Sequence, residues 1–295
     1  MDWLSILFNC RSHRCEPHCL CPGRYGSRLS IQSGWRRVRV SCFSIFRILI
    51  HPPFHSWEYP GKQGIGCNIV SSNDSANFLS FLQNLRGQNG AHDLILSAAV
   101  TDTPFLGSDG APMSDVSGFA QVLDYIGSSS PTHKCGSLLS DKCHAEVMNY
   151  DIWGSWSSTV GPNAPLDASC ATTQQGSATA AVKAWTGAGF PSSKMILGVP
   201  SYGRSFHVSP TNATDASGNI KMYASFDKSQ QPAGDKWDST ASGVDVCGNP
   251  NAVGGVFDFW GLINGGFLTT NGTVANGIDY TFDNCSKMVR VLCIP

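Results

Sequence analysis

From about residue 57 onward, the sequence predicts an α/β fold in which parallel β-strands are covered on their outer side by helices. Two observations support this prediction. Segments whose apolar residues recur at helical spacing alternate along the chain with short, continuous apolar runs typical of buried strands. Helices that alternate with strands in this way connect neighbouring parallel strands. The chain has 295 residues, which is enough for one large domain of this class.

Three helices are predicted from spacing and end signals. The first begins at the capping sequence Asn73-Asp74-Ser75 and ends at Gly87. The other two helices are recognised by apolar residues that share one side. In the second helix these are Val116, Phe119, Val122, Leu123 and Ile126. In the third, at about 174–186, they are Ala178, Val182 and Trp185.

Four apolar runs are predicted as strands. They cover residues 94–100, 146–153, 195–202 and 254–260. A segment rich in Gly, Asn, Asp and Ser, residues 204–253, forms an insertion between the last two strands. The body of the domain then covers 57–287, and residues 288–295 are a divergent tail.

Residues 1–56 differ in composition from the rest of the chain. They hold eight arginines, no lysine and only the acids Asp2 and Glu16, a net charge of +6 within a chain whose total is −1. The segment shows no sustained period of 2 or 3.6 residues. We therefore predict that the segment is not a native domain. Its cysteines and histidines lack the second ligand pair of a zinc finger, so we predict no metal site.

Cysteine usage and glycosylation triplets favour an extracellular protein. Seven cysteines are spread singly through loop-like sequence and are interpreted as disulfide partners rather than metal ligands. The N-terminus carries no convincing signal peptide. The seven cysteines are Cys67, Cys135, Cys143, Cys170, Cys247, Cys285 and Cys293, and the triplets start at Asn73, Asn212, Asn271 and Asn284.

Charge and hydropathy narrow the range of partners. Only 14% of the residues are charged and the net charge is near zero, which suits a neutral ligand and gives no reason to expect nucleic acid. No apolar stretch is long enough for a transmembrane helix, so no membrane association is predicted. We expect a monomer.

Polar and aromatic residues gather where the predicted strands end. The sequences are Trp57-Glu58-Tyr59-Pro60-Gly61, Met148-Asn149-Tyr150-Asp151, Tyr202-Gly203-Arg204 and Trp260. The carboxyl ends of parallel barrel strands are where ligands bind, because the following loops converge there. Aromatic rings beside a carboxylate, phenols and a guanidinium suit an uncharged sugar.

These four sequences, in this order, resemble the motifs of the glycoside hydrolase family 18 chitinases of fungal type. WEYPG resembles the end of the family's D-x-x-D-x-D-x-E signature, MNYDIWG its M-x-Y-D motif, GVPSYGR its G-x-P-x-Y-G-R strand, and GGVFDFWGL its last strand. The resemblance implies a TIM (β/α)8 barrel. Here it covers the end of strand 4 to strand 8, so a partial barrel is expected, from a chain truncated or mis-spliced at its N-terminus.

The resemblance also implies an activity. The expected reaction is hydrolysis of β-1,4 linkages between N-acetylglucosamine units of chitin or chito-oligosaccharides, with retention by substrate assistance and no cofactor. Glu58 is expected to be the general acid and Tyr150 to hold the acetamide group. The expected substrate-binding residues are Asp151 and Arg204, which bind hydroxyl or amide groups, and Tyr59, Met148, Tyr202 and Trp260, which shape the cleft.

The chain departs from the family pattern beside the expected acid. The family has acids two and four residues before it, where this chain has Ser56 and Phe54. A serine can form a hydrogen bond but cannot carry charge. The alternatives to an enzyme are therefore a catalytically inactive, lectin-like chitin-binding protein and a non-functional truncated product. Ordinary structural roles also stay open, such as an ion pair for Arg204 and a core position for Trp260.

Overall fold

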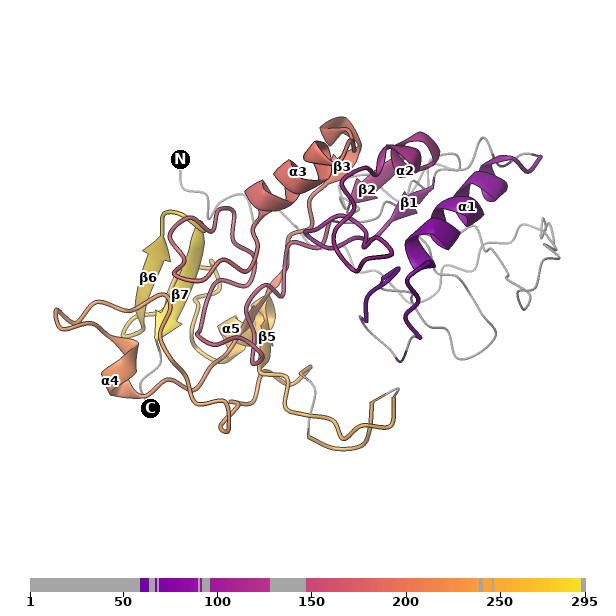
Figure 1. Ribbon diagram of the computed structural model, residues 1–295. Coiled ribbons are helices and arrows are strands. Elements are labelled where there is room, and N and C mark those ends of the chain that lie inside the picture. The colour runs from indigo at the N-terminus through magenta and orange to yellow at the C-terminus, as the bar shows by residue number, and fades with distance from the viewer. Residues whose placement is uncertain are drawn as a thin grey trace.

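The computed structural model describes residues 59–63, 67, 69–89, 91, 96–127, 147–238, 241–245 and 247–292. The segment 1–56 and the expected acid Glu58 lie outside the described residues. Figure 1 shows two parts, one that holds the parallel strands and three helices, and one that holds the antiparallel strands and two short helices.

A small parallel sheet organises the first part. Its strands are β1 (Ser97–Ala98), β2 (Tyr125–Gly127) and β3 (Met195–Ile196), in the order β1-β2-β3. Both strand pairs are parallel. The predicted parallel arrangement is therefore confirmed for this part, and no closed barrel is formed by the described residues.

Val147 lies in line with β2, between the continuations of β1 and β3. Ile126 pairs with Ala98 on one side and Met195 on the other. Val100 and Leu197 lie two residues after these partners, and Val147 forms parallel bridges to both of them. Val147 therefore stands where the second residue after Ile126 would stand in a continuous strand. Residues 128–146, which separate the two halves of this strand position, lie outside the described residues.

Three helices pack beside this sheet (Figure 1): α1 (Asp74–Arg86), α2 (Ser117–Val122) and α3 (Ala178–Gly187). The core between them is aromatic. Phe105 stacks edge-on against Trp185 with ring centroids 5.2 Å apart, and lies 4.5 Å from the Phe119 ring. The Trp185 indole N–H also donates to the Thr101 carbonyl at 3.0 Å, so α3 is fixed to the end of β1.

Several predicted details of these helices are wrong. Ile126 belongs to β2 rather than to the second helix, because the Asp124 N–H donates to the Leu96 carbonyl and draws the chain into the sheet. Val182 is 38% exposed, whereas Ala178 and Trp185 are buried as predicted. The Asn73 side chain does not cap α1. Instead the Asp74 carboxylate accepts the N–H groups of Gly61 and Ser71.

The second part is antiparallel. Strand β4 (Tyr202–Arg204) pairs antiparallel with β5 (Val256–Asp258), and β6 (Asp279–Asp283) with β7 (Met288–Leu292). The short helices are α4 (Pro210–Ala213) and α5 (Phe259–Asn264). The expectation that 254–260 forms a further parallel strand is therefore wrong, because these residues return alongside Tyr202–Arg204 and then begin α5.

Two disulfides join distant segments. Cys67 is bonded to Cys247 and Cys170 to Cys285, across 180 and 115 residues. This confirms the predicted role for these four cysteines, while Cys135, Cys143 and Cys293 lie outside the described residues. In the chain-entropy model a crosslink over about 100 residues stabilises the fold by roughly 5 kcal/mol. In the described part of the chain, no helix combines the length and the hydropathy needed to cross a membrane.

The interrupted strand predicts the effect of a deletion. Removal of residues 128–146 joins Gly127 to Val147 with the spacing that the sheet register requires. We expect the variant to keep its fold and to gain about 2 kcal/mol in unfolding free energy, because the ends of an intervening segment no longer have to be brought together. Urea unfolding followed by circular dichroism measures this.

A deletion of 127–146 is the matched control. It moves Val147 by one place, which turns every following side chain to the opposite face of the sheet, so this variant should be strongly destabilised. Equal stability of the two deletion variants would contradict a shared strand position.

Candidate functional site

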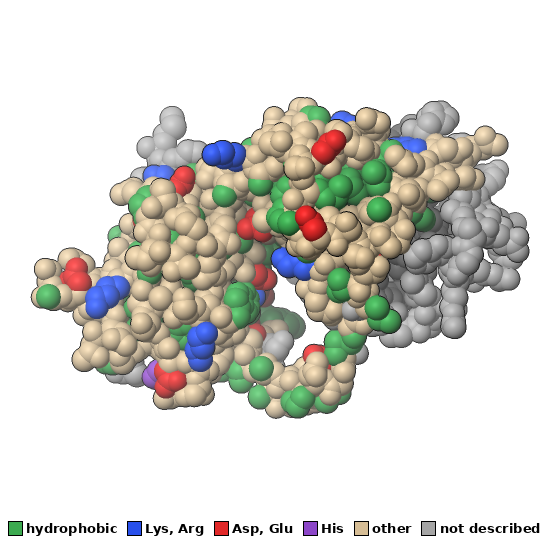
Figure 2. All heavy atoms as spheres, viewed as in Figure 1, with side chains coloured by type: hydrophobic (Ala, Val, Ile, Leu, Met, Phe, Trp, Pro, Cys, Tyr) green, Lys and Arg blue, Asp and Glu red, His purple; other side chains and the backbone are tan. Residues whose placement is uncertain are grey.

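The candidate site lies where the parallel strands end. The Met148 N–H donates to the Val100 carbonyl at 2.9 Å, and the Gly198 N–H to the Val147 carbonyl at 2.9 Å. These bonds place the residues that follow β1, Val147 and β3 next to one another. Figure 2 shows that this face of the molecule is hollowed between its two parts, with acidic and basic side chains at the opening.

Asp151 adopts a left-handed backbone conformation, with φ of 59°. This region is uncommon for residues other than glycine, although aspartate tolerates it. Asn163 holds the backbone there: its side-chain oxygen accepts the Asp151 N–H at 3.0 Å, and its amide donates to the Tyr202 carbonyl at 3.2 Å. Because Asn163 is only 6% exposed, it forms a rigid link between the Asp151 turn and β4.

The Asp151 carboxylate is the polar centre of the site. Its Oδ1 atom accepts the Tyr202 hydroxyl at 2.6 Å and the Nε and Nη2 atoms of Arg204 at 2.9 and 2.6 Å. Burial raises the pKa of the Tyr202 phenol above its usual value, and the hydrogen bond to Asp151 and its negative charge raise it further. Tyr202 therefore stays a neutral hydrogen-bond donor. The ion pair anticipated as an ordinary role for Arg204 is present.

Aromatic rings surround this carboxylate. The Tyr150 and Tyr202 rings meet edge to face with centroids 6.3 Å apart. The Arg204 guanidinium lies 4.9 Å from the centre of the Trp156 ring, a cation–π contact. Trp156 is 56% exposed, so its ring also offers surface to a ligand. Four of the expected residues, Tyr150, Asp151, Tyr202 and Arg204, are thus brought together.

The other expected residues lie on two sides of this group. The Tyr59 hydroxyl contacts the Met148 sulfur at 3.7 Å, which joins the WEYPG sequence to the MNYD sequence. Trp260 is on α5 and is 68% exposed, so it is not a core residue. The Phe259 N–H donates to the Ser201 carbonyl at 3.1 Å, which brings the start of α5 next to β4. Glu58 lies outside the described residues.

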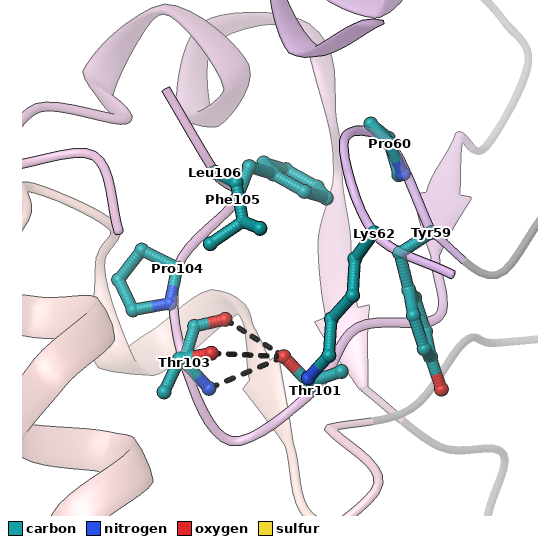
Figure 3. A pocket seen from close by; sticks show the side chains of 8 residues that line it. All are labelled: Tyr59, Pro60, Lys62, Thr101, Thr103, Pro104, Phe105 and Leu106. Carbon is teal, nitrogen blue, oxygen red and sulfur yellow. Dashed lines mark hydrogen bonds between the residues drawn. The ribbon is translucent and has the colours of Figure 1, made fainter. Parts of the chain in front are cut away.

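A shallow pocket opens beside Tyr59. Figure 3 shows its lining, in which the Lys62 side chain extends toward Thr101 and Tyr59 lies alongside. The Thr101 hydroxyl accepts the Thr103 N–H at 3.3 Å and also bonds the Thr103 hydroxyl at 3.2 Å. This local bonding fixes the turn that follows β1.

Three residues of the site were missed by sequence reasoning. Asn163 and Trp156 stand in a loop with no periodic signal, and their partners are distant in the sequence. Asp102 follows the β1 strand, and partial burial raises the pKa of its carboxyl while the positive charge of Lys62 acts in the opposite direction. An acid directly after a predicted strand was a signal that could have identified Asp102.

One group in the described residues has the spacing of a metal site, namely Cys170, Asp283 and Cys285. The two sulfur atoms are bonded to each other in a disulfide, so they do not serve as thiolate ligands in this structure.

This arrangement defines a class of protein. Rings, phenols, a carboxylate and a guanidinium gather at the carboxyl edge of parallel strands on an α/β scaffold, an arrangement that suits an uncharged polar ligand. The family model for glycosyl hydrolases family 18 matches residues 56–261, so the chain belongs to that family.

Comparison with curated proteins agrees. The chain is 46% identical to a chitinase-like effector of Moniliophthora roreri over 79% of its own length and 52% of that protein, and 42% identical to a chitinase-like effector of Moniliophthora perniciosa. Chitinase 63 of Streptomyces plicatus is 30% identical over 50% of this chain and 21% of that protein. The chain spans about half the length of the two Moniliophthora relatives.

Among solved structures, a chitinase from Rhizomucor miehei superposes with a TM-score of 0.63 at 30% identity, over 80% of this chain and 57% of that one. A group IV chitinase from Ostrinia furnacalis, solved in complex with allosamidin, has a TM-score of 0.52 at 22% identity, over 80% of this chain and 51% of that one. The family and these neighbours imply a TIM-barrel-type fold.

The Asp151 centre predicts a specific loss of stability. Asp151→Asn keeps a side chain that tolerates the left-handed backbone but removes the charge that binds Arg204. We expect the unfolding free energy to fall by about 1–3 kcal/mol, the usual contribution of hydrogen bonds to a charged group. Urea unfolding measures the change.

Asp279→Asn removes the same charge at an exposed position of β6 and is the control. It should change the stability by less than about 0.5 kcal/mol. If both variants lose the same amount, the effect is one of net charge and not of the Asp151 contacts.

Proposed function

We propose that this chain binds chito-oligosaccharides at the Asp151 site without hydrolysing them efficiently. The observation that carries the proposal is the set of contacts in which Asp151 joins Tyr202 to Arg204, with the Tyr150 ring against Tyr202. This set presents phenols, a charged pair and ring faces at one edge of the fold.

The chemistry of the site fits an N-acetylated sugar. Phenol hydroxyls and a guanidinium form hydrogen bonds with hydroxyl and acetamide groups, while ring faces pack against the apolar faces of sugar rings. Tyr150 is the residue that we assign to the acetamide group, and Asp151, Tyr59, Met148, Tyr202, Arg204 and Trp260 are assigned to the walls of the cleft. Membership of family 18 supports this choice of ligand.

The sequence next to Glu58 favours binding over turnover. Ser56 and Phe54 stand where the family has acids, so a carboxylate that would orient the acetamide is missing beside the proposed acid. Properly positioned general acid catalysis contributes about 10²–10⁴ to a rate. The name of the Moniliophthora relatives, chitinase-like effector, agrees with a role that does not depend on hydrolysis.

Substrate-assisted hydrolysis of chitin is the second candidate. It is favoured by the presence of both Glu58 and Tyr150, and by the similarity to Chitinase 63. In this mechanism the acetamide oxygen of the sugar is the nucleophile, Glu58 protonates the leaving oxygen, and no metal or cofactor takes part.

We also place the protein outside the cell. The two disulfides suit an oxidising compartment, and the similarity to the Moniliophthora effectors points the same way. Secretion can be measured directly as protein in the medium of a fungal culture.

Titration calorimetry with tri-N-acetylchitotriose tests the binding. The wild-type chain should bind, and Tyr150→Phe should bind about 10-fold more weakly, because one hydrogen bond to the sugar is lost. Tyr280→Phe, which removes a hydroxyl from an exposed position of β6, should bind as the wild type does. Absence of binding by a folded wild-type chain would refute the proposal.

Product analysis separates the two candidate functions. We expect no release of smaller oligosaccharides from a chito-oligosaccharide incubated with the wild-type chain. If release occurs and Glu58→Gln abolishes it while binding persists, the chain is a hydrolase with Glu58 as its acid, and the binding-only proposal is wrong.

A further inference from the structure

Asp102 stands at the same edge as the proposed sugar site. It is the second residue after Val100, which bridges Val147 in parallel, while Tyr150 is the third residue after Val147. The turns that follow these two strand positions therefore run side by side. Asp102 comes from a strand that carries none of the residues assigned so far.

A glycine makes room for the Asp102 carboxylate. A Cβ atom placed on Gly176 would lie 2.2 Å from the Asp102 Oδ2 atom and 3.4 Å from the Ile152 side chain. Gly176 also has a φ of +141°, which other residues rarely adopt. The carboxylate is thus packed between the start of α3 and the residue that follows Asp151, and it does not project freely into solvent.

Two other partly buried acids near the sheet already have partners within the chain. Asp124 binds the Arg86 guanidinium at 2.5 Å and the Leu96 N–H at 2.7 Å. Asp151 binds Tyr202 and Arg204. For Asp102, in contrast, no other residue of the described chain donates a hydrogen bond to its carboxylate, and its contact of opposite charge is the longer-range attraction to Lys62.

A half-buried carboxyl that receives no hydrogen bond from another residue is costly to keep unless something outside the chain satisfies it. Partial burial keeps its pKa raised despite the nearby Lys62. A sugar hydroxyl or an acetamide N–H is a donor of the right kind, and the proposed site brings both to this edge. Lys62 reaches along the pocket wall toward Thr101, the residue before Asp102, and so limits how far a ligand can shift (Figure 3).

We propose that Asp102 is a further sugar-contacting residue of this site, whose carboxylate accepts a hydrogen bond from a hydroxyl or acetamide N–H of the bound chito-oligosaccharide. The inference rests on the proposed binding function and extends it to a residue outside the four family-like sequences. It assigns a function to the turn after β1 and explains why position 176 holds a glycine.

Calorimetry on the full chain with tri-N-acetylchitotriose tests this assignment. Asp102→Leu, which has a similar shape but no polar atoms, should weaken binding about 10-fold or more. Asp102→Asn, which retains an acceptor oxygen, should lose less. Asp109→Asn removes the same charge from the exposed hairpin tip nearby and should bind as the wild type does.

Stability separates a ligand contact from a structural role. Because no other residue donates to the carboxylate, Asp102→Leu should unfold at the same or a higher urea concentration than the wild type. Weaker binding with unchanged or increased stability supports the assignment. Weaker binding that accompanies a loss of stability would overturn it, since Asp102 would then hold the fold.

The outcomes also separate this inference from the proposed function. If the wild type binds, Tyr150→Phe weakens binding and Asp102→Leu does not, the site is a sugar site and the Asp102 assignment alone is wrong. If the folded wild type does not bind at all, the proposed function fails and the Asp102 assignment fails with it.

Discussion

The fold depends on the register of one strand position, where Val147 bridges both Val100 and Leu197. Parallel pairing at this residue fixes where the neighbouring turns begin, and Asp102, Tyr150 and Asp151 follow within four residues of the bridged positions. Trp185 reinforces the arrangement, because its indole bonds the Thr101 carbonyl while its ring packs against Phe105. The sheet is short, so a change of register here would rearrange the site and the core together.

Much of the organisation could be predicted from residue patterns, because helices and buried strands leave periodic signals. The alternation located three helices and the parallel strands β1 and β3, but it missed β2, and within the predicted strand 146–153 only Val147 forms bridges among the described residues. Ile126 was misassigned because its spacing from Phe119 and Val122 fits a helix, and because the strand to which it belongs is interrupted after Gly127. A pattern of apolar residues also carries no direction, so nothing in 254–260 could show that it runs antiparallel to β4.

The candidate site was predicted in part, for a physical reason. Tyr150, Asp151, Tyr202 and Arg204 occur in compact sequences at strand ends, and strand ends converge. Asn163 and Trp156 act through contacts with residues many positions away, and a loop residue of this kind has no local signature. The sequence also did not predict that the Asp151 carboxylate is engaged by Tyr202 and Arg204 within the chain itself.

The carboxylates of Asp151 and Asp102 differ in how many hydrogen bonds they accept from the chain. A carboxylate whose oxygen already accepts three donors, as in Asp151, builds the wall and holds Tyr202 and Arg204 in place, because releasing them would leave charges unpaired. A carboxylate to which no other residue of the described chain donates, as in Asp102, keeps most of its hydrogen-bonding capacity for the ligand that we propose. Loss of the acids at positions 54 and 56 removes groups that matter for bond cleavage but leaves both of these carboxylates unchanged. The proposed sugar contacts therefore do not depend on the two acids that the family uses for bond cleavage.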